Sequence, residues 1–272
     1  MSCRDKACLV STVKLNFERK IEMKINKIKL NLGEDFSIKR TGWSLSQYDA
    51  LIYGVIDEVK THLNYQLAKS GSYKDAVVLA ESFINQNIIQ SINSHYHNPI
   101  ILPIMAEEKQ GKNAIPMGMA DVINKYTGWE VSENIYQTNK AGHTGANGWH
   151  RITTPALFMG NVVVGAEYLV LDDFIGMGGT LANIKSFIEN AGAKIAGFQV
   201  LTGKHDSSLL YLRNQTLENL RQKHGTFEKE FKEIVKFDYS KLTESEARYL
   251  LRAKTVERIR NQLSRSIREN YS

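Results

Sequence analysis

Apolar residues follow two kinds of pattern along this chain, and the change lies near residue 99. Residues 24–32 alternate apolar and polar positions, which predicts a half-buried strand. Residues 44–63 carry apolar side chains at helical spacing and residues 72–94 do the same, so we expect two helices that act as a cap or support. Beyond residue 99, short apolar runs alternate with helical stretches, which is typical of a largely parallel sheet.

The alternating region predicts the elements of this sheet one by one. We expect strands at 99–105, 129–132, 168–171 and 195–201. We expect helices at 116–126 and 179–191.

Beyond residue 205 the chain is helical and charged. Thr243, with Glu246 three residues on, is a capping box, and we expect it to begin one long basic helix that runs through Arg268. The fold class is therefore α/β, in four parts. These are a poorly packed basic arm (1–22), a strand with a helical cap (23–95), a parallel-sheet core (96–204) and a charged helical C-terminal extension (205–272).

Composition narrows the class of protein. Apolar residues make up 42% and charged residues 24%, which is the balance of a soluble globular protein. The net charge of +6 suits an anionic small ligand or a weak polyanion surface. No apolar run is long enough to span a membrane, and no secretory signal is evident. Cys3 and Cys8 lack partners at metal-ligand spacing, so we expect a protein of the reducing cytoplasm without a membrane partner.

Residues 168–180 carry the strongest chemical signal. Asp172 and Asp173 follow four apolar residues of a buried strand, at the position where open α/β sheets bind ligands. The glycines at 176–179 allow close approach to an anion, and the helix after them directs N–H groups and its positive dipole end toward that anion. A phosphorylated ribose would suit both features, because its hydroxyls can donate to the two aspartates and its phosphate can bind to the glycine loop. The competing interpretation is an ordinary strand-to-helix turn with two solvated aspartates.

The stretch 169–180 resembles the phosphoribosyl pyrophosphate motif of the type I phosphoribosyltransferases. That motif is a hydrophobic strand, two acids, two apolar residues, two small residues and then Gly-Gly-Thr. The resemblance implies a type I phosphoribosyltransferase-like core with helical N- and C-terminal additions. It also implies that Asp172 and Asp173 are catalytic and hold the ribose 2′- and 3′-hydroxyls, in part through Mg²⁺. The residues that would bind the 5′-phosphate are Gly176, Met177, Gly178, Gly179 and Thr180.

Two further segments acquire roles from this resemblance. A pyrophosphate loop is expected at 106–113, where the ligand-binding residues would be Lys109, Gly111 and Lys112; an ordinary surface loop is the alternative. A lid is expected at 138–154, because cations, glycines and Trp149 occur there together; an insertion with solvated cations is the alternative. The cations of the lid are Lys140, as a catalytic residue, and His143, His150 and Arg151.

Two residues depart from the motif. Gly176 stands where many relatives have an acid or a threonine, so one proton acceptor for an incoming purine is missing. Met177 replaces a usual Thr or Ser, so phosphate binding must depend on backbone N–H groups.

The resemblance implies that pyrophosphate is displaced from ribose C1 by a nucleobase or another nitrogen nucleophile. Two alternatives remain: a non-catalytic sensor of phosphoribosyl pyrophosphate or of a nucleotide, and a nucleic-acid-associated, defence-type effector that uses the basic C-terminal helix. For that helix we favour a solvated surface or a contact in a homo-oligomer, because acids are interspersed among its arginines.

Overall fold

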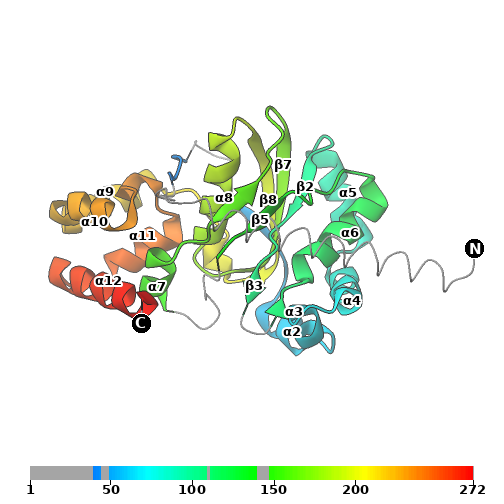
Figure 1. The fold of residues 1–272 in the computed structure, drawn as a ribbon, viewed down its shortest axis with the longest axis horizontal. Coiled ribbons are helices and arrows are strands. Elements are labelled where there is room, and N and C mark those ends of the chain that lie inside the picture. The colour runs from blue at the N-terminus through cyan, green and yellow to red at the C-terminus, as the bar shows by residue number, and fades with distance from the viewer. Residues whose placement is uncertain (1–38, 44–48, 109–110, 140–146, 272) are drawn as a thin grey trace, which may run out of the picture. The chain divides into compact units, whose positions relative to one another are not determined.

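The central sheet consists of four parallel strands in the described part of the chain (Figure 1). A computed structural model describes residues 39–43, 49–108, 111–139 and 147–271; the arm and the strand expected at 24–32 lie outside this set. The strand order is β1-β8-β7-β2. The bounds of these strands are β1 Ala50–Gly54, β2 Ile100–Pro103, β7 Glu167–Ile175 and β8 Lys194–Gly203.

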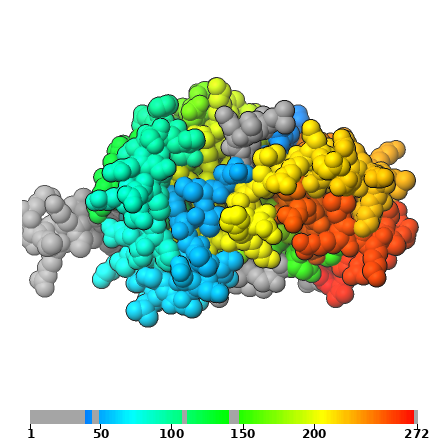
Figure 2. Space-filling view, turned by 180° about the vertical axis from the view of Figure 1, so that it is seen from behind, coloured from blue at the N-terminus to red at the C-terminus, as the bar shows by residue number. Residues whose placement is uncertain are grey.

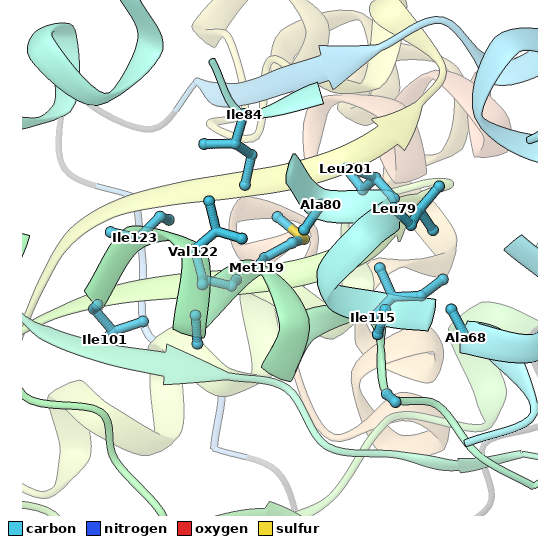
Figure 3. Close-up of a cluster of buried hydrophobic side chains, with 14 of the residues drawn as sticks. Ala68, Leu79, Ala80, Ile84, Ile101, Ile115, Met119, Val122, Ile123 and Leu201 are labelled. Atoms are coloured by element: carbon cyan, nitrogen blue, oxygen red, sulfur yellow. The ribbon is translucent and has the colours of Figure 1, made fainter. Parts of the chain in front are cut away.

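Helices pack against both faces of this sheet. One face of the sheet packs against the helices between β1 and β2 and against the helix after β2, and a buried apolar cluster fills the space between them. In this cluster Leu79, Ile115 and Met119 lie beside Leu201 of β8 (Figure 3). These helices are α2 Ile56–Thr61, α3 Tyr65–Lys69, α4 Tyr73–Phe83, α5 Gln86–His95 and α6 Ile115–Thr127. On the other face, α8 Gly179–Asn190 packs over a second cluster that includes Val170 and Phe198. The α/β class and the parallel sheet expected from the sequence are confirmed.

The elements around the main sheet agree with the expectation at several points. β2, β7, β8, α6 and α8 all form where the pattern places them, although β7 and β8 are longer than expected. Gly128 closes α6 in the left-handed conformation. The strand expected at 129–132 is reduced to one bridge between Ile101 and Val131. The short strands form two antiparallel pairs, β3 Glu107–Glu108 with β4 Gly111–Lys112 and β5 Ile135–Gln137 with β6 Phe158–Gly160.

The helix expected at 44–63 is wrong. Residues 44–48 lie outside the described residues, and the rest forms β1, then α2. The apolar residues at 51, 52, 55 and 59 suit helical spacing, but Leu51 and Ile52 also belong to a nearly continuous apolar run that pairs in parallel with β8. The helix expected at 72–94 is two helices, because Asn85 interrupts it and caps α5 by accepting a hydrogen bond from the Ile88 N–H.

The C-terminal extension forms a helical region with its own hydrophobic core. Phe227, Phe231, Tyr239 and Leu250 lie at the centre of a cluster that also takes in Trp149. Seen from behind, residues beyond about 200, coloured yellow to red, form one continuous part of the surface (Figure 2). The helices are α7 Gly148–Thr153, α9 Asn214–His224, α10 Glu228–Val235, α11 Glu244–Leu251 and α12 Val256–Tyr271, with single 3₁₀ turns at His205–Ser207, Gly225–Phe227 and Tyr239–Lys241.

The long helix expected from Thr243 onward is also wrong in its extent. The capping box of Thr243 and Glu246 is present and begins α11, as expected. However, α11 ends at Leu251, and Thr255 accepts a hydrogen bond from the Arg258 N–H at the start of α12. A second cap in the middle of the stretch therefore divides it into two helices. None of the helices that the structure describes is both long and apolar enough to cross a membrane.

Candidate functional site

The two aspartates lie within β7 and past the end of the neighbouring strand β2. The sequence pattern ended this strand at residue 171, but β7 continues to Ile175, which pairs with Gly203 of β8. On the other side the pairing stops earlier, because Pro103 of β2 faces Leu171 and the Ile104 N–H donates to the Leu171 carbonyl at 2.8 Å. Asp172 and Asp173 therefore stand at the edge where β2 has ended, which is the usual ligand crevice of an open α/β sheet.

Both carboxylates are buried, and one cation among the described residues contacts them. Asp172 is 8% exposed and Asp173 is 6% exposed. The Lys69 ammonium donates to Asp173 Oδ2 at 2.5 Å, and the Asp173 N–H donates to Asp172 Oδ1 at 2.8 Å. Burial raises the pKa of Asp172 well above its usual value, and the negative charge of Asp173 raises it further. A ligand that brings hydroxyl donors or a cation to this pair would relieve the excess of negative charge.

Lys69 is the main site residue that the sequence did not reveal. It belongs to α3, a five-residue helix in a segment interpreted only as support. The same end of α3 contacts the residue directly after the expected pyrophosphate loop, because the Ala114 N–H donates to the Ala68 carbonyl at 3.1 Å. Gly111 has a φ of +128°, and a Cβ there would lie 2.5 Å from the Ser70 carbonyl oxygen. This close approach of two backbones explains the glycine.

The expected pyrophosphate loop is thus a short hairpin held against α3. Lys112 is exposed on β4, while Lys109 lies outside the described residues. The hairpin therefore lies beside Ser70, the residue after Lys69, whose ammonium contacts Asp173.

The glycine loop forms the start of α8 as the sequence indicated. Gly178 is the N-cap residue, with φ +79° and ψ 2°, and no side chain caps the helix. A Cβ on Gly178 would lie 2.4 Å from Leu210 Cδ2, so both conformation and space require glycine there. Gly179 and Thr180 are the first helical residues, and N–H groups in the first turn have no partner within a helix. These groups can bind an anion, because the positive end of the helix dipole lies there as well.

The C-terminal helical region contacts the back of this loop. Ser207 Oγ donates to the Gly176 carbonyl at 2.6 Å, and Thr243 Oγ1 donates to the Met177 carbonyl at 2.6 Å. The Met177 side chain packs against the C-terminal hydrophobic cluster. The Met177 side chain is therefore taken up by this cluster, and the dependence of phosphate binding on backbone N–H groups stays a prediction.

One end of the expected lid is a docked helix. Residues 147–154 include α7, whose Trp149 ring meets the Tyr249 ring edge-on at 5.0 Å between centroids. Thr153 Oγ1 and Ser266 Oγ lie 2.9 Å apart, so α7 is also attached to α12. The interpretation of this end as a lid is therefore not supported, because its apolar side is part of the C-terminal core. Lys140 and His143 lie outside the described residues.

Arg151 is the lid cation that the structure brings to the glycine loop. A Cβ on Gly176 would lie 2.6 Å from Arg151 Nη1, so the absence of a side chain at 176 leaves room for the guanidinium. Burial lowers the pKa of Arg151, but an arginine remains charged in proteins. His150 is half-buried on the same short helix.

The donor set suits a cation carried by a ligand better than a cage made by the protein. No group of three or more His, Cys, Asp or Glu side chains that could hold a metal occurs among the described residues. Mg²⁺ is commonly held by one or two carboxylates together with substrate phosphates. Asp172 and Asp173 can supply such carboxylates, so Mg²⁺ remains a proposal.

Comparisons with known proteins find curated relatives whose names state no activity. No family model matches the chain. It is 33% identical to Protein TraN of Escherichia coli over 214 residues, which cover 78% of this chain and 48% of TraN. It is 34% identical to an uncharacterized protein of Haemophilus influenzae over 151 residues, covering 55% of this chain and 34% of that protein. The chain thus spans about half or less of the length of these curated relatives.

Two solved structures that resemble the chain do so at low similarity. Adenine phosphoribosyltransferase matches with a TM-score of 0.33 and 11% identity, over 53% of this chain and 79% of that one. UMP synthase of Leishmania donovani matches with a TM-score of 0.30 and 13% identity, over 65% of this chain and 33% of that one. At this level of similarity, the strand order and the helices of the chain itself, given above, describe the fold.

Proposed function

We propose that this chain binds a phosphorylated ribose and uses phosphoribosyl pyrophosphate as a substrate. The observation that carries the proposal is a continuous unit at the edge of the sheet, in which Asp172 and Asp173 lead through a glycine loop to the uncapped start of α8. In this proposal the ribose hydroxyls donate to the carboxylates, and the 5′-phosphate accepts from the N–H groups of residues 177–180. Lys69 adds positive charge next to Asp173, and Arg151 adds it next to Gly176.

The proposed reaction is transfer of the phosphoribosyl group. The bond between ribose C1 and the pyrophosphate oxygen breaks, and its electron pair leaves with the pyrophosphate. A bond from C1 to a nitrogen of the acceptor forms, and that nitrogen gives its proton to the leaving pyrophosphate or to water. Positive charge develops on the ribose ring, and the buried carboxylates can stabilise it. Lys69 and Arg151 can stabilise the negative charge of the phosphates. Mg²⁺, when bound with the ligand, would neutralise part of the charge on the leaving pyrophosphate.

Calorimetric titration with phosphoribosyl pyrophosphate and Mg²⁺ tests the binding. We expect saturable binding by the wild-type protein and a loss of at least about tenfold in affinity when Asp172 and Asp173 are both changed to Asn, because each charge-assisted hydrogen bond contributes roughly 1.5–3 kcal/mol. Asp57→Asn makes the same chemical change at an exposed residue of α2 and should leave the affinity unchanged. Equal affinity in the double variant and the wild type would refute the proposed site.

Release of pyrophosphate separates an enzyme from a sensor. One observation favours the sensor: Gly176 carries no proton acceptor, and the Met177 side chain packs away in the C-terminal cluster. The protein should be incubated with phosphoribosyl pyrophosphate, Mg²⁺ and a panel of nucleobases and simple amines. Release that depends on one acceptor supports a transferase, whereas binding without release by any acceptor supports the sensor.

A further inference from the structure

We infer that Ser207 and Thr243 are positioning residues that orient the peptide groups of the phosphate loop, so that the C-terminal helical region completes the phosphate site of the core. This inference deepens the proposed function and depends on it for the identity of the anion. Two consecutive carbonyls of the loop, those of Gly176 and Met177, each accept a hydrogen bond of 2.6 Å from one of these hydroxyls. Both hydroxyls come from beyond residue 204, outside the strand-loop-helix unit itself.

Peptide geometry converts these two contacts into a direction for the N–H groups. A trans peptide unit is planar, and its C=O and N–H bonds point to opposite sides. When the Gly176 carbonyl points to Ser207, the Met177 N–H points away from Ser207. The Gly178 N–H likewise points away from Thr243. Gly178 is left-handed and the helical Gly179 follows it, a sequence of conformations in which successive N–H groups form an anion-binding nest.

The Thr243 hydroxyl is held rigidly. Thr243 is fully buried, and its Oγ1 also accepts from the Glu246 N–H at 3.1 Å in the capping box of α11. Glu246 in turn accepts two hydrogen bonds from Arg40, whose Nε donates to Asn183 Oδ1 of α8 at 2.7 Å. The same network therefore joins the cap of α11 to the helix that the phosphate loop begins.

The Ser207 hydroxyl and the side of the loop are fixed as well. Ser207 is buried, its N–H donates to the Lys204 carbonyl at 2.8 Å, and its Oγ accepts from Ser245 Oγ at 3.0 Å. Leu210, from the same segment, occupies the space next to Gly178 that a Cβ would need. The loop is thus held by two hydroxyls and one apolar contact before any ligand binds. Preorganised donors of this kind bind an anion without the cost of reorienting them.

Four variants separate this role from simple stability. Thr243→Val and Ser207→Ala each remove one hydroxyl from the loop, while Thr243→Ser keeps it. Thr243→Val also removes the cap of α11, but Ser207 caps no α-helix, so Ser207→Ala remains informative if the first variant folds poorly. Thr216→Val is the matched control, because Thr216 Oγ1 donates to Glu244 Oε1 of α11 and not to a carbonyl of the loop.

The first measurement is amide hydrogen exchange at residues 176–180 in the ligand-free proteins. Thr243→Val and Ser207→Ala should speed exchange in this loop by about tenfold, whereas Thr243→Ser and Thr216→Val should match the wild type. Because no ligand is present, this result tests the positioning apart from the proposed function. Unchanged exchange in both hydroxyl-removing variants would overturn the inference.

The second measurement compares affinity for ribose 5-phosphate with affinity for ribose. The two variants should bind ribose 5-phosphate about five- to tenfold more weakly than the wild type, and Thr243→Ser should restore the affinity. Wild-type protein that binds neither compound would refute the proposed function, and altered loop exchange would still support the positioning. Wild-type binding that both hydroxyl-removing variants retain in full would overturn the positioning.

Discussion

The buried charges at the edge of the sheet and those in the C-terminal region are balanced in different ways. At the sheet edge, Asp172 and Asp173 share one described cation, Lys69, and burial raises the pKa of Asp172. Between α8 and the C-terminal helices, Arg40 and Glu246 are matched one to one in a bidentate pair, each side chain about 1% exposed.

The pair of Arg40 and Glu246 also has more hydrogen-bond and ring contacts with the residues around it than the two aspartates have. Arg40 donates to Asn183 Oδ1 and to the Lys241 carbonyl, and its guanidinium stacks on the Phe237 ring at 4.1 Å. Such a pair stabilises one arrangement of the chain, whereas an unbalanced acid pair costs stability until a ligand binds. This difference distinguishes a structural ion pair from a candidate ligand site, and four predictions test it.

The largest effect should come from breaking the matched pair. Glu246→Gln leaves the buried guanidinium of Arg40 without a counter-charge, so we expect a loss of about 3–5 kcal/mol in the free energy of unfolding, measured in urea. Glu269→Gln is the matched control, because Glu269 pairs with Arg265 on the exposed face of α12. A Glu246→Gln protein as stable as this control would remove the distinction between the two regions.

The next effect concerns the loop that connects the two regions. Gly178→Ala must adopt a φ of +79° and place its Cβ 2.4 Å from Leu210 Cδ2, so we expect it to lose about 2 kcal/mol or more of stability. Gly225→Ala serves as the control, because Gly225 has a φ of −61° and its nearest neighbouring atom is 3.8 Å from the Cβ position. Equal urea midpoints for the two variants would contradict the strain assigned to Gly178.

The third effect has the opposite sign. The raised pKa of Asp172 means that the folded state binds this proton more tightly than the unfolded state. Stability therefore falls as pH rises from the usual aspartate value of about 3.9 through the raised folded pKa. Asp172→Asn removes this loss, so it should stabilise the ligand-free protein at pH near 7.5 by about 1 kcal/mol while weakening ligand binding.

The pH dependence is the check on this third prediction. At a pH of about 3 or below the wild-type carboxyl is mostly protonated in both states, so the advantage of the Asn variant should disappear. Urea unfolding at the two pH values measures this directly, and Asp57→Asn should show no such difference because Asp57 is exposed. An Asp172→Asn protein that is less stable than wild type at pH 7.5 would show that the carboxylate stabilises the fold.

The two regions also differ in how far the sequence predicts them. The strand, acids, glycines and helix of residues 168–191 follow one another directly, so local pattern and chemistry were enough. Lys69 reaches Asp173 across 104 residues, and Arg40 reaches Glu246 across 206. Neither residue stands in a recognisable motif, and only tertiary packing creates those contacts.

The prediction of secondary structure from the sequence was wrong where pairing with a distant strand decides which element forms. The apolar spacing around Leu51 suits a helix, and the strand forms there because β8 provides a partner about 150 residues later. The capping box at Thr243 and Glu246 was predicted as a local feature. Its second use, as support for the phosphate loop, depends on a hydrogen bond to the Met177 carbonyl across 66 residues and could not be read locally.

The smallest effect is expected on the basic face of α12. Ile259 and Leu263 are fully buried in the C-terminal core, while Arg258, Arg265 and Arg268 are exposed on the other side of the helix. Changing these three arginines to Gln should leave the urea midpoint and the affinity for ribose 5-phosphate unchanged, because exposed charges contribute little to stability.

The same triple variant tests whether this face binds nucleic acid. Arg265 is paired with Glu269 at 2.8 Å and Glu257 lies beside Arg258, so acids offset part of the positive charge. We therefore expect no retardation of DNA or RNA by the wild-type protein in a gel-shift assay at about 0.1 M salt, and no difference in the variant. Contact with a nucleic acid would instead give an affinity that falls steeply with salt, because neutralised phosphates release counterions. A gel shift by the wild-type protein that weakens with salt and is lost in the triple variant would show that α12 binds a polyanion. The basic face of α12 would then be a second ligand-binding region, beside the candidate site at the edge of the sheet.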